Sequence, residues 1–551
     1  MRISSTAWLA LVTATSIGFA LGAAQDNVKI SPNHIRGAER LIALEWTVSE
    51  RDSMAEDLGD NVDNYRKLRE VSIANGVPPA LRFDPLPLGR ELPTKRRPLV
   101  MGPPKQLELP DTQEKLAFYS VRDLAELIRT RRVTSSELTQ MYLERLKRFG
   151  PSLECVVTIT EDLAMDQAVR ADREIAEGKY RGPLHGIPYG AKDLLAVKGY
   201  RTTWGAEPYK NQVLEEDATV VKRLEEAGAV LVAKLTLGAL AWGDVWYGGK
   251  TRNPWDLEQG SSGSSAGSAA ATAAGLVAFS IGTETWGSIV SPSTRCGATG
   301  LRPTYGRVSR AGAMALSWSM DKIGPICRTV EDCALVFDAI IGPDGIDRTV
   351  VDAPFNYAPS VDMRHLRIGH AKRLFDEDYP NRPADAATLA TLRELGADLV
   401  EVELPDYPVE AMAIILQAEA AAAFDELTRS GEDDLMVRQI RNAWPNVFRA
   451  SRFIPAVEYI QANRLRYKII QEMGKLDVDV YVAPSFGGDN LLLTNLTGHP
   501  CVVLPNGFDE KGRPGSISFI GGLYDEATLL AVAKAYQDAT DFDQQHPPLF
   551  Q

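Results

Sequence analysis

Hydrophobic positions between residues 120 and 548 alternate between helical spacing and short continuous apolar runs. Ser120 and Thr134 each precede an apolar-periodic segment in the way that helix N-caps do, and the second segment predicts a helix through Leu146. Four short runs rich in β-branched residues predict buried strands: Val156–Thr160, Val230–Ala233, Val277–Ile281 and Val478–Ala483. This alternation predicts an α/β domain over residues 117–548, with helices on both faces of a mixed sheet.

The first 24 residues have the layout of a secretory signal peptide. Arg2 supplies a positive charge, Thr6–Leu21 is apolar and uncharged, and the small residues Gly22–Ala24 follow. An uncleaved membrane anchor is the alternative, although the apolar stretch is short for a span of about 20 residues. Cleavage after residue 23 or 24 would place the mature chain in the periplasm or outside the cell. No later segment is apolar enough to span a membrane.

Residues 25–116 form a predicted N-terminal extension with two parts. Over residues 33–75, apolar side chains recur at roughly helical spacing among many charges, which predicts a polar helical stretch. Residues 76–110 are rich in proline, which excludes a continuous helix and favours extended backbone along a surface. The pattern is compatible both with a strap over the main domain and with a linker.

Composition and charge narrow the classes of function. The 551 residues are 44% hydrophobic and 24% charged, which is typical of a globular protein. Lys and Arg number 60 against 73 Asp and Glu, a net charge of −13. Nucleic-acid binders and proteins of anionic membranes need a basic field, so the sequence argues against both as partners. The five cysteines are scattered without disulfide-framework or metal-ligand spacing, and no metal or organic cofactor is expected.

A Gly/Ser-rich loop, Gly260–Ser268, precedes the helix-forming run Ala269–Ala274. By composition alone such a segment is a flexible linker. Its place inside a folded domain, before a helix and a buried strand, instead predicts a loop that presents backbone N–H groups and hydroxyls to a ligand.

Gly263–Gly267 also satisfies the G-x-S-x-G pattern, with Ser265 as the nucleophile of an α/β-hydrolase-like esterase. That interpretation requires a buried strand immediately before the serine. Residues 253–259 are polar, contain a proline and make a poor strand, so the context fits only in part. A histidine downstream could still act as the base, and the esterase stays an alternative.

Lys192 lies in a mostly uncharged stretch, Gly182–Asp193. A surface lysine paired with Asp193 is the ordinary interpretation, whereas a desolvated lysine would lose its proton and become a base. Further along, Ile281–Ile289 predicts a strand that enters a glycine-containing turn with a serine. Successive N–H groups of such a turn can form an oxyanion hole.

These pieces occur together in the order and spacing of one family. The stretch Gly186–Asp193, the Gly/Ser loop and the turn Gly282–Ile289 resemble the amidase signature family. Further segments resemble it too: Arg252–Asp256, Gly300–Ser309, Ile323–Pro325, Arg328–Asp332, Thr494–Pro500 and Asp525–Leu530. The resemblance covers about residues 117–548 and implies the fold of that family, a twisted mixed β-sheet sandwiched between layers of α-helices.

The resemblance implies a catalytic triad of a lysine, a serine with a cis peptide bond and a second serine. Matching motif to motif places them at Lys192, Ser264 and Ser288, with the two serines 24 residues apart as the family pattern requires. The oxyanion hole falls on the N–H groups of Thr285, Trp286, Gly287 and Ser288. Ser265 and Ser268 then become loop and helix-start residues whose hydroxyls cap or bond locally.

The sequence departs from the family pattern at four positions. Trp286 and Ala266 stand where the family usually has glycines, and Glu284 replaces the usual aspartate. An indole at 286 would crowd or line the acyl pocket. Val290 occupies a position where members often have an arginine, which argues against recognition of a substrate carboxylate there.

The resemblance therefore implies a serine amidase that hydrolyses a small-molecule carboxylic amide to acid and amine or ammonia through an acyl-enzyme, and the predicted signal peptide implies that this amidase is exported. Some family members are subunits that generate ammonia for tRNA-bound glutamate, a cytosolic role that conflicts with export. A catalytically degenerate protein that binds an amide without turnover is a further alternative. The sequence leaves the oligomeric state open, with a homodimer as one candidate.

Overall fold

The computed structural model describes residues 29–102 and 107–551. The predicted signal peptide, residues 1–24, lies outside the described residues. The chain divides into two compact units, one up to Ile73 and the other from Ala74 onward.

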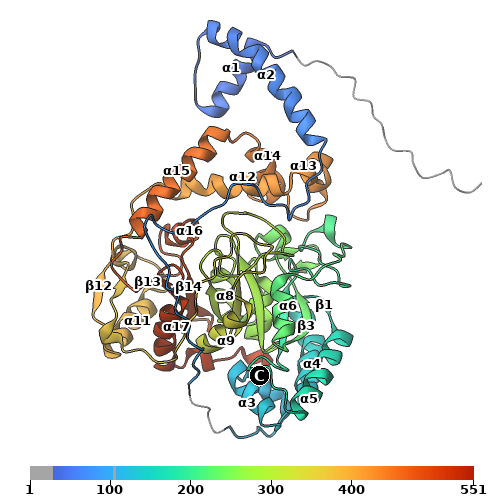
Figure 1. The fold of residues 1–551 in the computed structure, drawn as a ribbon, viewed down its shortest axis with the longest axis vertical. Coiled ribbons are helices and arrows are strands. Elements are labelled where there is room, and N and C mark those ends of the chain that lie inside the picture. The colour runs from blue at the N-terminus through green and yellow to red at the C-terminus, as the bar shows by residue number, and fades with distance from the viewer. Residues whose placement is uncertain (1–28, 103–106) are drawn as a thin grey trace, which may run out of the picture. The chain divides into compact units, whose positions relative to one another are not determined.

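The smaller unit contains two helices, α1 (Pro32–Ile42) and α2 (Val48–Arg69), where the sequence predicted one polar helical stretch (Figure 1). Ala43 ends α1 in the left-handed conformation. Thr47 then begins α2, because its hydroxyl accepts the backbone N–H of Glu50 in a capping box.

The larger unit is built on an eleven-stranded sheet. In spatial order its strands are β1 (Val156–Ile159), β3 (Val230–Leu235), β2 (Pro188–Lys192), β8 (Phe279–Glu284), β10 (Lys322–Cys327), β9 (Thr299–Arg302), β14 (Cys501–Phe508), β15 (Pro514–Gly521), β13 (Val480–Pro484), β11 (Ile368–His370) and β12 (Leu399–Glu401). β2 pairs in parallel with β3 and β8, whereas β10 pairs antiparallel with β8. The sheet is mixed, as the sequence predicts, and each of the four predicted strands is present.

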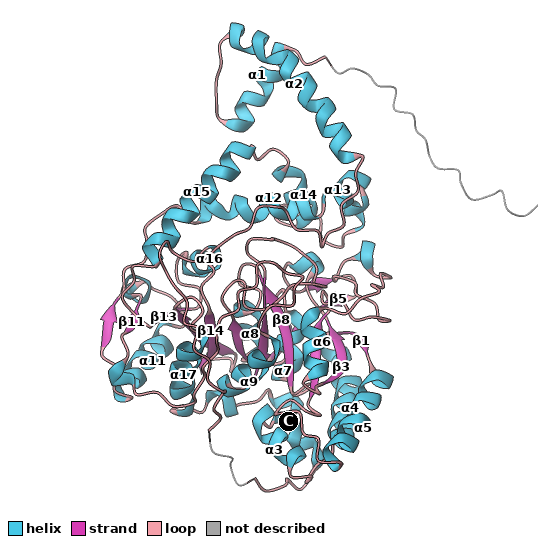
Figure 2. Ribbon diagram, viewed as in Figure 1, coloured by secondary structure: helices cyan, strands magenta, loops and turns pink. Residues whose placement is uncertain are grey.

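Helices surround the sheet (Figure 2). They are α3 (Val121–Arg129), α4 (Ser135–Leu153), α5 (Glu161–Ala176), α6 (Thr219–Glu226), α7 (Ala266–Ala273), α8 (Val290–Cys296), α9 (Val330–Ile340), α10 (Lys372–Asp376), α11 (Arg382–Glu394), α12 (Ile414–Ala423), α13 (Asp425–Ser430), α14 (Trp444–Ser451), α15 (Ala456–Met473), α16 (Asn490–Leu496) and α17 (Glu526–Asp538). The predicted N-caps are confirmed, since the side chains of Ser120 and Thr134 accept the backbone N–H three residues on.

Both faces of the sheet are buried. On β3, Val230 and Val232 belong to the hydrophobic cluster under α4, α5 and α7, while Leu231 belongs to the larger cluster that includes α9 and α17. Alternate residues of one strand thus enter two cores, as expected of a strand covered by helices on both sides. The predicted fold class, a mixed sheet between layers of helices, is confirmed.

The proline-rich segment lies along the larger unit as a strap. The side chain of Asn75 donates to the carbonyl of Ala315 and accepts its N–H, at 2.9 and 2.8 Å. Further along, Val100 donates its N–H to the carbonyl of Tyr357 at 3.0 Å. These contacts favour the strap over the linker.

Within the described ranges, 29–102 and 107–551, there is neither a helix long and apolar enough to cross a membrane nor a cluster of three or more potential metal ligands. All five cysteines are buried and unpaired.

Candidate active site

Lys192 is the last residue of β2, and its side chain is completely buried. Its Nζ lies 2.8 Å from Ser264 Oγ, 3.0 Å from Ser265 Oγ and 2.8 Å from Thr283 Oγ1. The carbonyl of Thr283 accepts a further hydrogen bond from Nζ at 3.4 Å. Burial lowers the pKa of Lys192 well below its ordinary value, although two nearby carboxylates oppose the shift. A neutral amine held in this way can accept a proton from a serine hydroxyl.

Asp193, the neighbour of Lys192 in sequence, does not pair with it. Its Oδ1 lies 2.7 Å from Nζ of Lys234 on the adjacent strand β3, and both side chains are buried. Its Oδ2 accepts the backbone N–H and the hydroxyl of Thr203. The interpretation of Lys192 as a surface lysine paired with Asp193 is therefore wrong.

Ser264 lies in the Gly/Ser loop that precedes α7, and its peptide bond with Gly263 is cis, as the family resemblance implies. A side chain at 263 would not fit, because a Cβ there would lie 1.8 Å from the carbonyl oxygen of Gly243. The backbone N–H of Ser265 donates to the carbonyl of Ser288 at 3.1 Å. The loop that carries Ser264 is thus tied directly to the turn that carries Ser288.

Ser265 has a different role from the one that the resemblance implied. Its hydroxyl does not cap α7. It donates to the carbonyl of Thr283 at 3.0 Å and accepts the N–H of the same residue at 3.1 Å. The hydroxyl therefore joins the Gly/Ser loop to β8, since it satisfies both backbone groups of one strand residue.

The position of Ser265 does not fit the nucleophile of an α/β-hydrolase. The segment before the loop does form a strand, β7 (Asp256–Gly260), contrary to the sequence prediction, because it pairs with β6 (Arg252–Asn253) in a separate two-stranded sheet. It is not a strand of the main sheet. In the part of the chain that the structure describes, no histidine forms a hydrogen bond with Ser265, whose side chain is fully buried.

Ser288 lies in the turn between β8 and α8, and it is 8% exposed. Gly287 has a φ of +84°, a conformation that favours glycine. The backbone N–H groups of Thr285, Trp286, Gly287 and Ser288 donate to no acceptor among the described residues. Four successive N–H groups beside a serine hydroxyl are thus available to a ligand.

Glu284 holds this turn in place. One carboxylate oxygen accepts the N–H groups of Ile289 and Val290 at 2.8 and 2.9 Å. The other accepts from Arg302 Nη1 and Asn495 Nδ2, both at 2.8 Å. Burial opposes ionisation, but the Arg302 guanidinium and these hydrogen bonds outweigh it and lower the pKa of Glu284 to about 2. The glutamate that replaces the family's aspartate therefore keeps a charged anchor at the base of the turn.

A sequence model of the family described as Amidase matches residues 137–491, which is more than half of the chain. This chain belongs to the amidase signature family. The match, here called the amidase core, includes Lys192, the Gly/Ser loop and the turn with Ser288; of the contacts described above, only that of Asn495 lies beyond it.

Curated relatives and solved structures agree with this assignment. This chain is 35% identical over 480 residues to a glutamyl-tRNA(Gln) amidotransferase subunit of Methylococcus capsulatus, a match that covers 78% of this chain and 98% of the relative. It is 36% identical over 479 residues to the corresponding protein of Roseiflexus sp., with the same coverage. The structure of native peptide amidase from Stenotrophomonas maltophilia superposes with a TM-score of 0.68 at 30% identity, covering 77% of this chain and 97% of that one.

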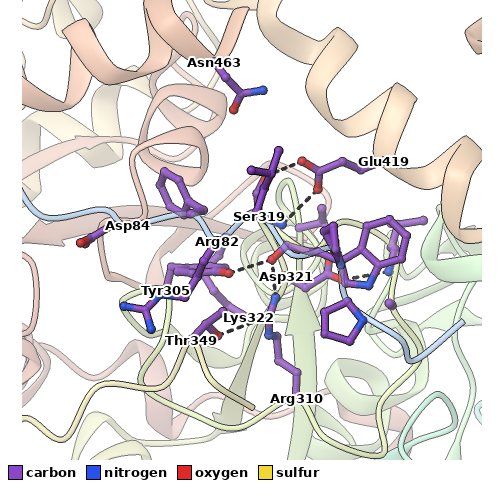
Figure 3. A pocket seen from close by; sticks show the side chains of 18 of the residues that line it. Arg82, Asp84, Tyr305, Arg310, Ser319, Asp321, Lys322, Thr349, Glu419 and Asn463 are labelled. Atoms are coloured by element: carbon purple, nitrogen blue, oxygen red, sulfur yellow. Dashed lines mark hydrogen bonds between the residues drawn. The ribbon is translucent and has the colours of Figure 1, made fainter. Parts of the chain in front are cut away.

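Figure 3 shows a cavity of about 1710 Å³. Its lining includes Thr283, which holds Lys192, and Thr285, which belongs to the turn before Ser288, so the cavity adjoins the candidate site. Residues 311–316 and parts of α12 and α15 form other walls. Trp286 is not among the described residues that line it, and its indole is 42% exposed.

Sequence reasoning missed two residues that the structure places beside the site. Thr283 supplies the hydroxyl and the carbonyl that hold Lys192. Asp321 accepts the hydroxyl of Thr285 at 2.6 Å and the N–H groups of Leu316 and Ser317 at 2.8 and 2.9 Å. Asp321 stands two residues before the family motif Ile323–Pro325. Its nearness to that motif is the sequence signal that could have pointed to it.

The three residues of the implied triad do not form a continuous chain of hydrogen bonds. Lys192 reaches Ser264, but among the described side chains none is hydrogen-bonded to the Ser288 hydroxyl. Catalytic hydrogen bonds are often long in ligand-free enzymes and tighten when substrate is bound. The roles of these residues stay predictions.

Proposed function

We propose that this amidase-family chain is an exported serine amidase, which hydrolyses a carboxylic amide to acid and amine or ammonia through an acyl-enzyme. One arrangement carries the proposal. The buried amine of Lys192 is hydrogen-bonded to Ser264, and the loop of Ser264 is joined by one hydrogen bond to the turn 285–288. The four backbone N–H groups of that turn donate to no described residue. A base, a relay hydroxyl and an oxyanion hole are the parts that amide hydrolysis by a serine needs.

The proposed mechanism follows the order of these groups. Neutral Lys192 accepts a proton from Ser264 as Ser264 accepts the proton of Ser288, and Ser288 Oγ attacks the amide carbonyl. The N–H groups of residues 285–288 stabilise the oxyanion of the tetrahedral intermediate. Ser264, resupplied by Lys192, protonates the leaving amine, and water then hydrolyses the acyl-enzyme.

A second candidate comes from the relatives, which are named as amidotransferase subunits. In that case the chain would release ammonia from glutamine for a partner enzyme. The valine at position 290, where members often have an arginine, argues against the binding of an α-carboxylate at that point. The degenerate amide-binding protein and the homodimer also stay predictions.

An amide panel with an active-site probe tests the proposal. The purified chain should release ammonia from at least one neutral primary amide and should be labelled by a fluorophosphonate on Ser288, as mapped by peptide mass spectrometry. Glutamine serves as the comparison substrate, because hydrolysis confined to glutamine would favour the amidotransferase role. A folded chain with neither labelling nor hydrolysis would contradict the amidase and favour the degenerate alternative, whereas labelling of Ser265 would favour the esterase.

Export, which we propose from the first 24 residues, has a separate test. Expressed in full in a bacterial host, the chain should be recovered outside the cytosol without its first 23 or 24 residues, as measured by intact-mass spectrometry. The variant Leu11→Arg, which interrupts the apolar stretch, should stay uncleaved in the cytosol. Intact Met1 on cytosolic wild-type protein would contradict export.

A further inference from the structure

The strap forms one wall of the cavity beside the candidate active site. Residues of the segment 76–88 line the same cavity as Thr283, which holds Lys192, and Thr285, which belongs to the turn before Ser288 (Figure 3). The family match begins only at residue 137. This wall is therefore contributed by a part of the chain outside the amidase core.

Several contacts hold the strap against the larger unit. Arg82 donates from Nη1 to the carbonyl of Arg348 at 2.7 Å. The ring of Phe83 lies 3.5 Å from the guanidinium carbon of Arg466 and packs edge-on against Tyr305. The N–H of Leu88 donates to the side chain of Gln471 at 2.9 Å. The strap is thus attached to the larger unit at several points between residues 82 and 88.

Two large apolar side chains of the strap that line the cavity are mostly uncovered. Leu81 is 84% exposed and Leu88 is 85% exposed, and both line the cavity. The lining also includes apolar side chains outside the strap, among them Leu194, Leu316 and Ile323. An apolar ligand in this cavity would remove that surface from water.

Several charged side chains of the cavity are engaged by the protein itself. Glu419 accepts hydrogen bonds from Ser317, Ser319 and Tyr459. Arg310 forms an ion pair with Asp347, with Nε 2.9 Å from Oδ2. Because these groups hold the walls together, the binding surface that remains for a ligand is mainly apolar.

We infer that strap residues 76–88 determine substrate specificity and select amides that carry a large apolar group. The inference rests on the proposed amidase function and adds the substrate class to it. The amide carbonyl lies at the turn 285–288, and the apolar group extends past Thr285 and Leu316 toward Leu81 and Leu88.

Two substrate series and one double variant test the inference. Primary amides from acetamide to octanamide lengthen the acyl group, and N-alkyl acetamides from methyl to hexyl lengthen the amine. In at least one series kcat/KM should rise with length, by up to about fourfold for each added CH₂. The double variant Leu81→Ser/Leu88→Ser should lower kcat/KM for the long members of that series roughly tenfold, because two apolar contacts are lost. Activity on acetamide should stay within about twofold, since a short substrate does not reach the strap.

Leu435→Ser is the matched control, because Leu435 is 57% exposed and does not line the cavity. Both leucines of the double variant are exposed, so its thermal unfolding should match that of the wild type. Equal loss on short and long amides, or no length dependence in either series, would overturn the inference while leaving the amidase function intact. Absence of hydrolysis of every amide together with absence of Ser288 labelling would instead reject the proposed function.

Discussion

Replacing Ser288 with alanine is expected to lower kcat/KM for any amide substrate by about 10⁴-fold or more, the scale seen when a serine nucleophile is removed. The reason is chemical: no acyl-enzyme forms without the Oγ that attacks the carbonyl. The fold should tolerate the change, because the Ser288 hydroxyl makes no hydrogen bond with the described residues and the substitution removes a single oxygen atom. Steady-state ammonia release measures the effect, and fluorophosphonate labelling should be lost in parallel.

Two other serines serve as controls. Ser291→Ala, one helical turn away, should leave activity near the wild-type level, because its side chain is outside the hydrogen-bond network of the site. Ser265→Ala should cost less activity than Ser288→Ala and more stability, since it leaves the N–H of Thr283 without its partner and the carbonyl of Thr283 with only the longer bond from Lys192. A ranking in which Ser265→Ala abolishes activity and Ser288→Ala does not would reject the assignment of Ser288 as nucleophile.

The activity on a neutral amide should rise with pH and reach a plateau through an apparent pKa far below the ordinary value of lysine. Burial lowers the pKa of Lys192, so the neutral, proton-accepting form is populated at lower pH, and activity is lost as pH falls and Nζ becomes protonated. The apparent value belongs to the coupled lysine and serines rather than to one group. A pH profile of kcat/KM measures it.

Lys192→Ala should remove this pH-dependent limb and lower kcat/KM for amides by about 10²–10⁴-fold. Activated esters should lose less, because their leaving groups need no proton. Lys192→Arg should not restore activity, since a guanidinium does not lose its proton in proteins. Lys198→Ala is the control and should behave as wild type, because Lys198 is exposed in the loop that follows β2. Full amidase activity in Lys192→Ala would show that another group is the base.

The local features of this fold were predictable from the sequence because each depends on residues close together in the chain. The N-caps Ser120 and Thr134 bond three residues on, and each predicted β-branched run is a strand of the sheet. Lys192, Ser264 and Ser288 were found through motif spacing, which needs no knowledge of tertiary contacts. The motifs do not show which group each of these side chains contacts in the folded protein.

Tertiary structure alone decided those partners. Whether Lys192 pairs with Asp193 depends on β3, which brings Lys234 to Asp193 and leaves the amine of Lys192 to Ser264 and Thr283. The hydroxyl of Ser265 bonds to the backbone of Thr283 in β8 rather than to its own helix, because the fold packs the Gly/Ser loop against that strand. Likewise, proline content predicted an extended segment at 76–110, but only packing against the larger unit made it a wall of the cavity. Burial and hydrogen bonding between strands distant in sequence set these outcomes, and neither quantity is encoded in a local pattern of residues.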